Sequence, residues 1–208
     1  MAHDRPLLID VPERLIGVRV VVRAYTDADA QAVYDAVRES VAHIRPWLPW
    51  YDTHETLDDT HETLDDTRDF IRGAAARWAA RESFDMGVFA CGDGRFLGGV
   101  GLIVRDWRVP YFEIGYWLRE SAEGYGYMGD AVRLLTTYAF EGLEARHIEI
   151  RCDARNTRSA RVAERQGYVL EGRLRHDMRD PVGDLRDSLV YAMIPADYER
   201  AHEAWPRS

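Results

Sequence analysis

A glycine-rich turn carries the clearest chemistry in this sequence. Gly124-Tyr125-Gly126-Tyr127-Met128-Gly129 follows a segment of strand-like composition, residues 111–118, and precedes a segment with apolar residues at helical spacing. Glycine accepts positive φ angles and lets the backbone approach a ligand closely. The free N–H groups and the dipole at the start of a helix attract negative charge. The turn therefore predicts an anion site that suits a diphosphate group.

Three kinds of diphosphate ligand compete for this turn. A P-loop nucleotide site is excluded, because that loop needs a lysine and the chain contains none. A dinucleotide fits the G-x-G-x-x-G spacing of Gly124, Gly126 and Gly129, with Glu149 at a suitable distance for a ribose contact. The third candidate is the diphosphate arm of coenzyme A, and the rest of the chain must decide.

Composition predicts a single globular domain that stays in the cytoplasm. The 208 residues are 46% hydrophobic and 30% charged, and this length can bury a substantial core. No apolar run approaches the roughly 18 residues of a membrane span, and the N-terminus lacks the pattern of a signal peptide. The net charge of −9 disfavours nucleic acid and favours a cationic partner such as an amine or a basic peptide, although solubility alone also explains it.

The cysteines and the acidic residues do not predict a metal site. Cys91 and Cys152 are the only cysteines, and they form neither a CxxC motif nor a Cys/His pairing. Residues 53–66 repeat Thr-His-Glu-Thr-Leu-Asp-Asp twice. We interpret this repeat as a tolerated insertion and a solvated acidic entrance to a helix, with Thr53 or Thr60 as the helix cap. We therefore expect no metal.

The order of the predicted elements decides against the dinucleotide. A Rossmann domain begins with its glycine fingerprint and continues with βαβ units, whereas more than 110 residues precede the turn here. The sheet must be mixed, antiparallel early and parallel across the helix that follows Gly129. The pattern predicts strands at 14–25, 84–91, 95–106, 111–118, 146–153, 168–175 and 185–194, and helices at 27–40, up to about 82, after 129, at 156–166 and at the C-terminus.

Three segments carry a resemblance to a known family. They are EIGYWL at 113–118 with EGYGYMGDA at 123–131, ARNTRSARVAERQGYVLEGRLR from Ala154, and HIRPWLPW at 43–50. Together they resemble the GNAT superfamily of N-acetyltransferases, and more narrowly its Rim-type branch, which acetylates protein N-termini, including those of ribosomal proteins. The resemblance implies one GNAT-like domain at 8–200 of α/β (α+β) class, with the 53–66 repeat as an insertion. It implies a mixed, mostly antiparallel sheet flanked by helices, with a splayed central strand pair.

The resemblance also implies how acetyl-CoA, the co-substrate, is held. Main-chain groups of Trp117 and Leu118 would contact the pantetheine and the thioester, where a bulge parts their strand from the next one. Asn156 would hydrogen-bond the pantetheine arm. The main chain of the turn would hold the diphosphate, through Gly124, Tyr125, Gly126, Tyr127, Met128 and Gly129. One departure is Ser121, because the superfamily often places Gln or Arg there for a phosphate contact.

Amide formation from a thioester also needs a proton donor for the departing thiolate. Many members of the superfamily use a tyrosine seven residues after the motif asparagine, and this chain has Ala163 there. The Rim-type pattern implies Ser159, which the chain retains.

The general base that takes the proton of the amine is predicted to be Glu113. Period-two alternation places Glu113 on the same side of its strand as Trp117, and an aromatic neighbour would desolvate a carboxylate. A carboxylate paired with an arginine on a sheet face is an equally good interpretation. Glu149 and His147 on the following strand are the reserves.

The acceptor is the least defined part of the prediction. Trp47, Trp50 and Tyr51 would line its pocket, although the same loop would also serve as a lid over the core. A protein or peptide N-terminus is the first choice, and a polyamine, an aminoglycoside-like amine or a succinyl donor are alternatives. A non-catalytic acyl-CoA-binding module is the alternative from a different class, and both a monomer and a homodimer fit.

Overall fold

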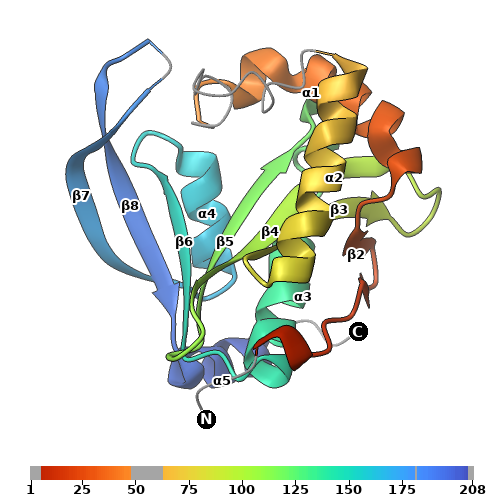
Figure 1. The fold of residues 1–208 in the computed structure, drawn as a ribbon. Helices are drawn as coiled ribbons and strands as arrows, with labels where there is room; N and C mark the ends of the chain where they lie inside the picture. The colour runs from red at the N-terminus through yellow and green to blue at the C-terminus, as the bar shows by residue number, and fades with distance from the viewer. Residues whose placement is uncertain (1–5, 48–62, 181, 206–208) are drawn as a thin grey trace.

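The computed structural model describes residues 6–47, 63–180 and 182–205. Within these ranges the chain builds one eight-stranded sheet in the order β1-β2-β3-β4-β5-β6-β8-β7, with helices on both of its faces (Figure 1). The strands are β1 (Arg14–Ile16), β2 (Val20–Ala24), β3 (Ser83–Ala90), β4 (Phe96–Asp106), β5 (Tyr111–Leu118), β6 (His147–Asp153), β7 (Val169–Arg179) and β8 (Leu185–Met193). The helices are η1 (Pro6–Leu8), η2 (Asp27–Asp29), α1 (Ala30–Ile44), α2 (Leu64–Ala80), η5 (Glu120–Ala122), α3 (Tyr127–Gly142), α4 (Thr157–Arg165) and α5 (Pro195–Ala204).

The predicted fold class is confirmed, with a mixed and mostly antiparallel sheet. Only β5 and β6 run parallel among the described strands, joined by α3. One strand prediction was wrong: residues 14–25 form the short hairpin β1–β2, because the chain reverses at Gly17, whose N–H donates to the Val20 carbonyl at 2.9 Å.

The central strands β5 and β6 pair over a short stretch and then splay apart. β5 and β6 pair at Tyr111↔His147, Phe112↔Ile148 and Glu113↔Glu149. Beyond these positions their upper ends diverge in Figure 1. The predicted bulge at 116–118 is absent from the described ladder, since β4 and β5 stay in register from Gly98↔Leu118 to Val104↔Phe112. The β4–β5 ladder has a bulge elsewhere, at Arg105, which is an extra residue in β4. The gap arises because β6 diverges from β5 beyond Glu113.

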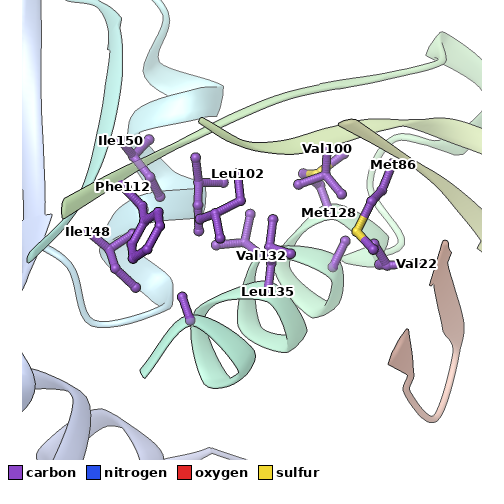
Figure 2. Close-up of a cluster of buried hydrophobic side chains, with 14 of the residues drawn as sticks. Val22, Met86, Val100, Leu102, Phe112, Met128, Val132, Leu135, Ile148 and Ile150 are labelled. Carbon is purple, nitrogen blue, oxygen red and sulfur yellow. The ribbon is translucent and has the colours of Figure 1, made fainter. Parts of the chain in front are cut away.

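A large apolar cluster fixes α3 against the sheet (Figure 2). Alternate residues of the strands, including Phe112 and Ile114, point to this side and are almost fully buried. They meet the apolar face of α3, which contributes Val132 and Leu135. A second, smaller cluster lies under α1 and includes Val37, Phe89 and Phe96, with Trp117 packed against it. The start of α3 is therefore held rigidly beside the gap.

The start of α2 shows how the sequence sets the position of a helix. Thr63 caps α2: its Oγ1 accepts from the Asp66 N–H at 3.2 Å, and its own N–H donates to the Asp66 carboxylate at 2.8 Å. The predicted caps Thr53 and Thr60 lie outside the described residues. None of the helices in the described ranges has the length and apolar character needed to cross a membrane.

Candidate active site

A pocket of about 530 Å³ occupies the opening between the splayed strands. Its walls come from the end of α1, the free half of β5, the loop before α3, and α4. The lining includes His43, Ile44, Trp47, Tyr116, Trp117, Leu118, Glu123, Gly124, Gly126, Tyr127, Met128, Gly129, Asn156, Arg158, Ser159, Arg161, Val162 and Arg165. The pocket thus brings together most of the residues that the sequence singled out, from four separate segments.

The glycine turn has the backbone geometry of an anion site. Gly124 and Gly126 take φ angles of +82° and +79°, a region that favours glycine. Gly126 is the N-cap of α3 and supplies no side-chain hydrogen bond to the helix. The N–H groups of Tyr127, Met128 and Gly129 in the first turn therefore remain for a ligand. This turn, residues 124–129, is called the diphosphate loop below.

The diphosphate loop also packs closely against α4. A Cβ on Gly129 would lie 2.9 Å from the amide nitrogen of Gln166, which is itself buried. Arg158, Arg161 and Arg165 follow one face of α4 at a spacing of three and four residues and line the same pocket. A stripe of arginines beside a ring of free N–H groups suits a ligand with several phosphates.

Asn156 and Ser159 lie together at the start of α4. Asn156 is the N-cap, and its Oδ1 accepts from the Ser159 N–H at 3.1 Å. This contact uses the carbonyl of the Asn156 side chain, so its NH₂ group is available to donate to a ligand. The predicted helix start at Asn156 is confirmed.

The Ser159 hydroxyl has a partner that the sequence did not suggest. Tyr116 Oη lies 3.0 Å from Ser159 Oγ and donates to the Ser159 carbonyl oxygen at 3.1 Å. Burial raises the pKa of Tyr116 well above its usual value, so its phenol stays neutral and can donate a hydrogen bond. Tyr116 precedes Trp117, and only the tertiary fold shows that its ring crosses the gap to α4.

The main chain of β5 offers polar groups to the gap. Amide groups of a strand turn to alternate sides, and Arg119 N–H donates to the Leu97 carbonyl on the β4 side at 2.8 Å. By the same alternation the backbone of Trp117 faces β4, and the backbones of Tyr116 and Leu118 face the gap. We infer that Leu118 presents the main-chain groups there, whereas Trp117 contributes its side chain to the pocket wall.

The predicted base lies where the strands part, in an ion pair. Glu113 pairs with Arg105, the extra residue of the β4 bulge, and its side chain is 14% exposed. The neighbouring Glu149 is more buried and accepts from the Tyr111 hydroxyl, with His147 Nε2 at 4.0 Å. These carboxylates are not among the described residues that line the pocket. The structure thus shows the arginine pairing that the sequence left as an alternative, and Glu113 as a base stays a prediction.

The acceptor side is only partly described. Trp47 lines the pocket beside the end of α1, whereas Trp50 and Tyr51 lie outside the described residues. His43 Nε2 lies 2.5 Å from a Glu123 carboxylate oxygen, and Arg158 Nη1 donates to the other oxygen at 3.1 Å. This cluster joins α1, the residue just before the diphosphate loop and α4, and all three side chains line the pocket.

A second contact ties α1 to the segment that precedes the loop. Arg119 pairs with Glu39, and the hydrogen bond from Arg119 lowers the pKa of Glu39 to about 2. The other oxygen of Glu39 accepts from the Ser121 N–H at 3.0 Å. Ser121, the family departure, therefore has its main chain anchored to α1.

Several of these residues escaped the sequence analysis for a common reason. Tyr116 and Glu123 stood inside recognised motifs, but nothing local indicated that they reach another element. The arginines of α4 had a recognisable helical spacing, which could have pointed to a basic face. Among the described residues, no group of three or more His, Cys, Asp or Glu side chains is arranged to hold a metal ion.

Comparisons with known proteins identify the class. The family model described as an acetyltransferase (GNAT) domain matches residues 19–169. The chain therefore belongs to the GNAT family, and it is an acetyl-CoA-dependent N-acetyltransferase.

Particular relatives place the chain on the Rim-like branch. It is 36% identical to the probable N-acetyltransferase YjcK of Bacillus subtilis over 121 residues, 57% of this chain and 66% of that protein. It is 27% identical to the putative ribosomal N-acetyltransferase YdaF of the same organism over 185 residues, 88% of this chain and 96% of that protein. The solved structure of RimL, a ribosomal L7/L12 α-N-protein acetyltransferase in complex with coenzyme A, superposes with a TM-score of 0.77 at 25% identity, covering 88% of this chain and 98% of that one.

Proposed function

We propose that this enzyme transfers an acetyl group from acetyl-CoA to the α-amino group of a protein or peptide. The observation that carries the proposal is the continuous pocket that joins the diphosphate loop, the gap beside β5 and the end of α1. Such a pocket can hold a long thioester with its phosphates at one end and its acyl group at the other. The acceptor class rests on the names of the relatives YdaF and RimL, and on the net charge of −9, which favours a cationic partner.

The donor would bind through groups already positioned at the pocket. The diphosphate would accept from the free amides of Tyr127, Met128 and Gly129, with the arginine stripe of α4 nearby. The Asn156 NH₂ group would donate to the pantetheine arm, and the backbone of Leu118 would contact the thioester. The proposed site includes the main chain of all residues of the diphosphate loop, 124–129. The Tyr125 side chain itself is exposed, and its ring stacks on that of Tyr127.

The reaction forms a C–N bond and breaks the C–S bond of the thioester. The amine must lose a proton. We assign Glu113 as the general base that takes this proton through water, because Glu113 lies where β5 and β6 part. The thiolate must gain a proton, which we assign to the Ser159 hydroxyl. Tyr116 would orient this hydroxyl and would stabilise the Ser159 oxygen by a hydrogen bond after the proton has left. Each proton then has a named origin and destination.

A thiol-release assay tests the proposed acceptor. The acceptors are a lysine-free peptide with a free N-terminus, the same peptide formylated at its N-terminus, spermidine and an aminoglycoside, each with acetyl-CoA or succinyl-CoA. We expect release with the free peptide and acetyl-CoA, and mass spectrometry should place the acetyl group on the α-amine. Ser159→Ala serves as the control for enzyme-dependent release.

Each alternative has its own outcome in the same assay. Faster release with spermidine or the aminoglycoside than with the free peptide would replace the peptide by a small amine. Faster release with succinyl-CoA would change the donor. Tight acetyl-CoA binding without thiol release from any acceptor would contradict the proposal and favour a binding module.

A further inference from the structure

Arg19 connects the β1–β2 turn to the diphosphate loop across 106 positions of sequence. Its Nη1 donates to the Tyr125 carbonyl oxygen at 2.7 Å, and its Nε donates to the Asp130 carboxylate at 2.6 Å. A Cβ on Gly126 would lie 3.1 Å from Nη2 of Arg19. The guanidinium group therefore lies directly against the backbone of the loop.

The contact with Tyr125 fixes the orientation of one peptide group. A trans peptide is planar, so the Tyr125 C=O and the Gly126 N–H point in opposite directions. Because Arg19 holds the carbonyl, the Gly126 N–H points away from Arg19. Gly126 lines the pocket, whereas Arg19 is not among the described lining residues. The Gly126 N–H therefore points toward the pocket, away from the side of the loop that Arg19 covers.

Glycine makes this peptide easy to reverse. Gly126 has a φ angle of +79° and, lacking a Cβ, can adopt the opposite sign at little cost. A reversed peptide would aim the Tyr125 carbonyl oxygen at the place where a diphosphate binds. The contact with Arg19 opposes this reversal.

Asp130 gives Arg19 a second role. Its carboxylate lies in the first turn of α3, next to the amides that would bind negative charge, and its side chain is 11% exposed. Arg19 and Arg133 both pair with it, and Arg133 Nη2 donates to the second oxygen at 2.7 Å. The Asp130 hydrogen bond raises the pKa of Arg19 above its already high value, so the guanidinium group stays charged. Together the two arginines offset a charge that would repel a diphosphate.

We propose that Arg19 is a positioning residue for coenzyme A: it holds the Tyr125–Gly126 peptide with its N–H toward the diphosphate and offsets the charge of Asp130. This inference rests on the acyl-CoA site of the proposed function and does not depend on the acceptor.

Calorimetric titration with coenzyme A gives the first test. Arg19→Ala should weaken binding by about tenfold or more, as for loss of a hydrogen bond that involves a charged group. Arg133→Ala is the matched control, since it removes the other partner of Asp130 and leaves the Tyr125 contact intact. It should weaken binding by less than about threefold. Unchanged affinity in Arg19→Ala, or an equal loss in Arg133→Ala, would overturn the positioning role.

A truncated donor separates positioning from general damage. Acetyl-pantetheine lacks the diphosphate, so Arg19→Ala should lower kcat/KM for acetyl-CoA through KM and leave kcat/KM for acetyl-pantetheine unchanged. An equal fall with both donors would mean a structural defect and would contradict the inference. If no amine is acetylated by the unaltered enzyme, the proposed function fails, and the coenzyme A titration still decides the role of Arg19.

Discussion

Glu113 and Glu149 are register partners at the point where β5 and β6 part. Glu113 pairs with Arg105, and Glu149 accepts from Tyr111, so each carboxylate has a different neighbour. This arrangement allows the two candidate bases to be compared directly. Glu113→Gln should lower kcat by about 10²-fold, which is typical for the loss of a general base, and should flatten the acidic limb of the pH–rate profile.

The matched variant for this prediction is Glu149→Gln. It should keep the shape of the profile, because a more buried carboxylate held by Tyr111 has a structural role. If Glu149→Gln flattens the profile and Glu113→Gln does not, the reserve residue is the base and the assignment of Glu113 is wrong.

Ser159 and Tyr116 should act as one unit. Ser159→Ala should lower kcat by about 10²-fold with little change in the KM for acetyl-CoA, because the hydroxyl acts on the leaving thiolate. Tyr116→Phe should lower kcat by a smaller factor, since it removes the partner of that hydroxyl and keeps the ring. In the double variant the loss should be no greater than in Ser159→Ala alone. Multiplicative losses would show that the two hydroxyl groups act independently.

Buried tyrosines should make the fold sensitive to alkaline conditions. Burial raises the pKa of Tyr168 well above its usual value, and burial raises the pKa of Tyr198 to about 12. These phenols keep their protons in the folded chain at a pH where the unfolded chain loses them. Rising pH therefore favours unfolding: the stabilisation is complete below about pH 10, the ordinary tyrosine pKa, and is lost as pH rises through the folded values.

Urea titrations between pH 8 and about pH 11 measure this effect. The free energy of unfolding should stay level and then fall above about pH 10. Tyr168→Phe should make the fall shallower. It also removes the hydrogen-bond partner of the Thr136 hydroxyl, which lies 2.7 Å from Tyr168 Oη. Tyr125→Phe, at an exposed position, is the control and should leave the slope as it is.

The capping box of α2 predicts the effect of shortening the repeat. Thr63→Ala should lower the free energy of unfolding by about 1 kcal/mol, because it removes the cap of a 17-residue helix. Deletion of residues 53–59 should leave stability close to that of the full chain, since the second copy keeps Thr63 and Asp66 in place. Equal destabilisation by the deletion and by Thr63→Ala in urea titrations would contradict the interpretation of a tolerated insertion.

Local patterns predicted the parts of the site that are made by single segments. The diphosphate loop and the cap at Asn156 follow from short motifs, because turn glycines and N-caps act over a few residues. The splayed strand pair was implied only by the resemblance to the GNAT family. The β1–β2 hairpin was missed because Gly17 stands alone, without the paired turn residues that mark a hairpin.

Contacts between distant segments could not be predicted from one sequence. The ring of Tyr116 meets Ser159 across 43 positions, and Arg19 meets Tyr125 across 106. An arginine in a surface hairpin looks the same in sequence whether its guanidinium reaches solvent or another loop. The pairing of Glu113 with Arg105 depended on a bulge in β4 that adds one residue opposite β5.

The divergence of β6 leaves the edge of β5 beyond Glu113 without a neighbouring strand in the part of the chain that the structure describes. The amide hydrogens of Tyr116 and Leu118 on that edge should exchange with deuterated water faster than those of Trp117, which the β4 ladder protects. A bound thioester arm would take the place of the missing strand and slow that exchange. Mass-resolved deuterium uptake at β5 would then report donor occupancy before any chemistry occurs.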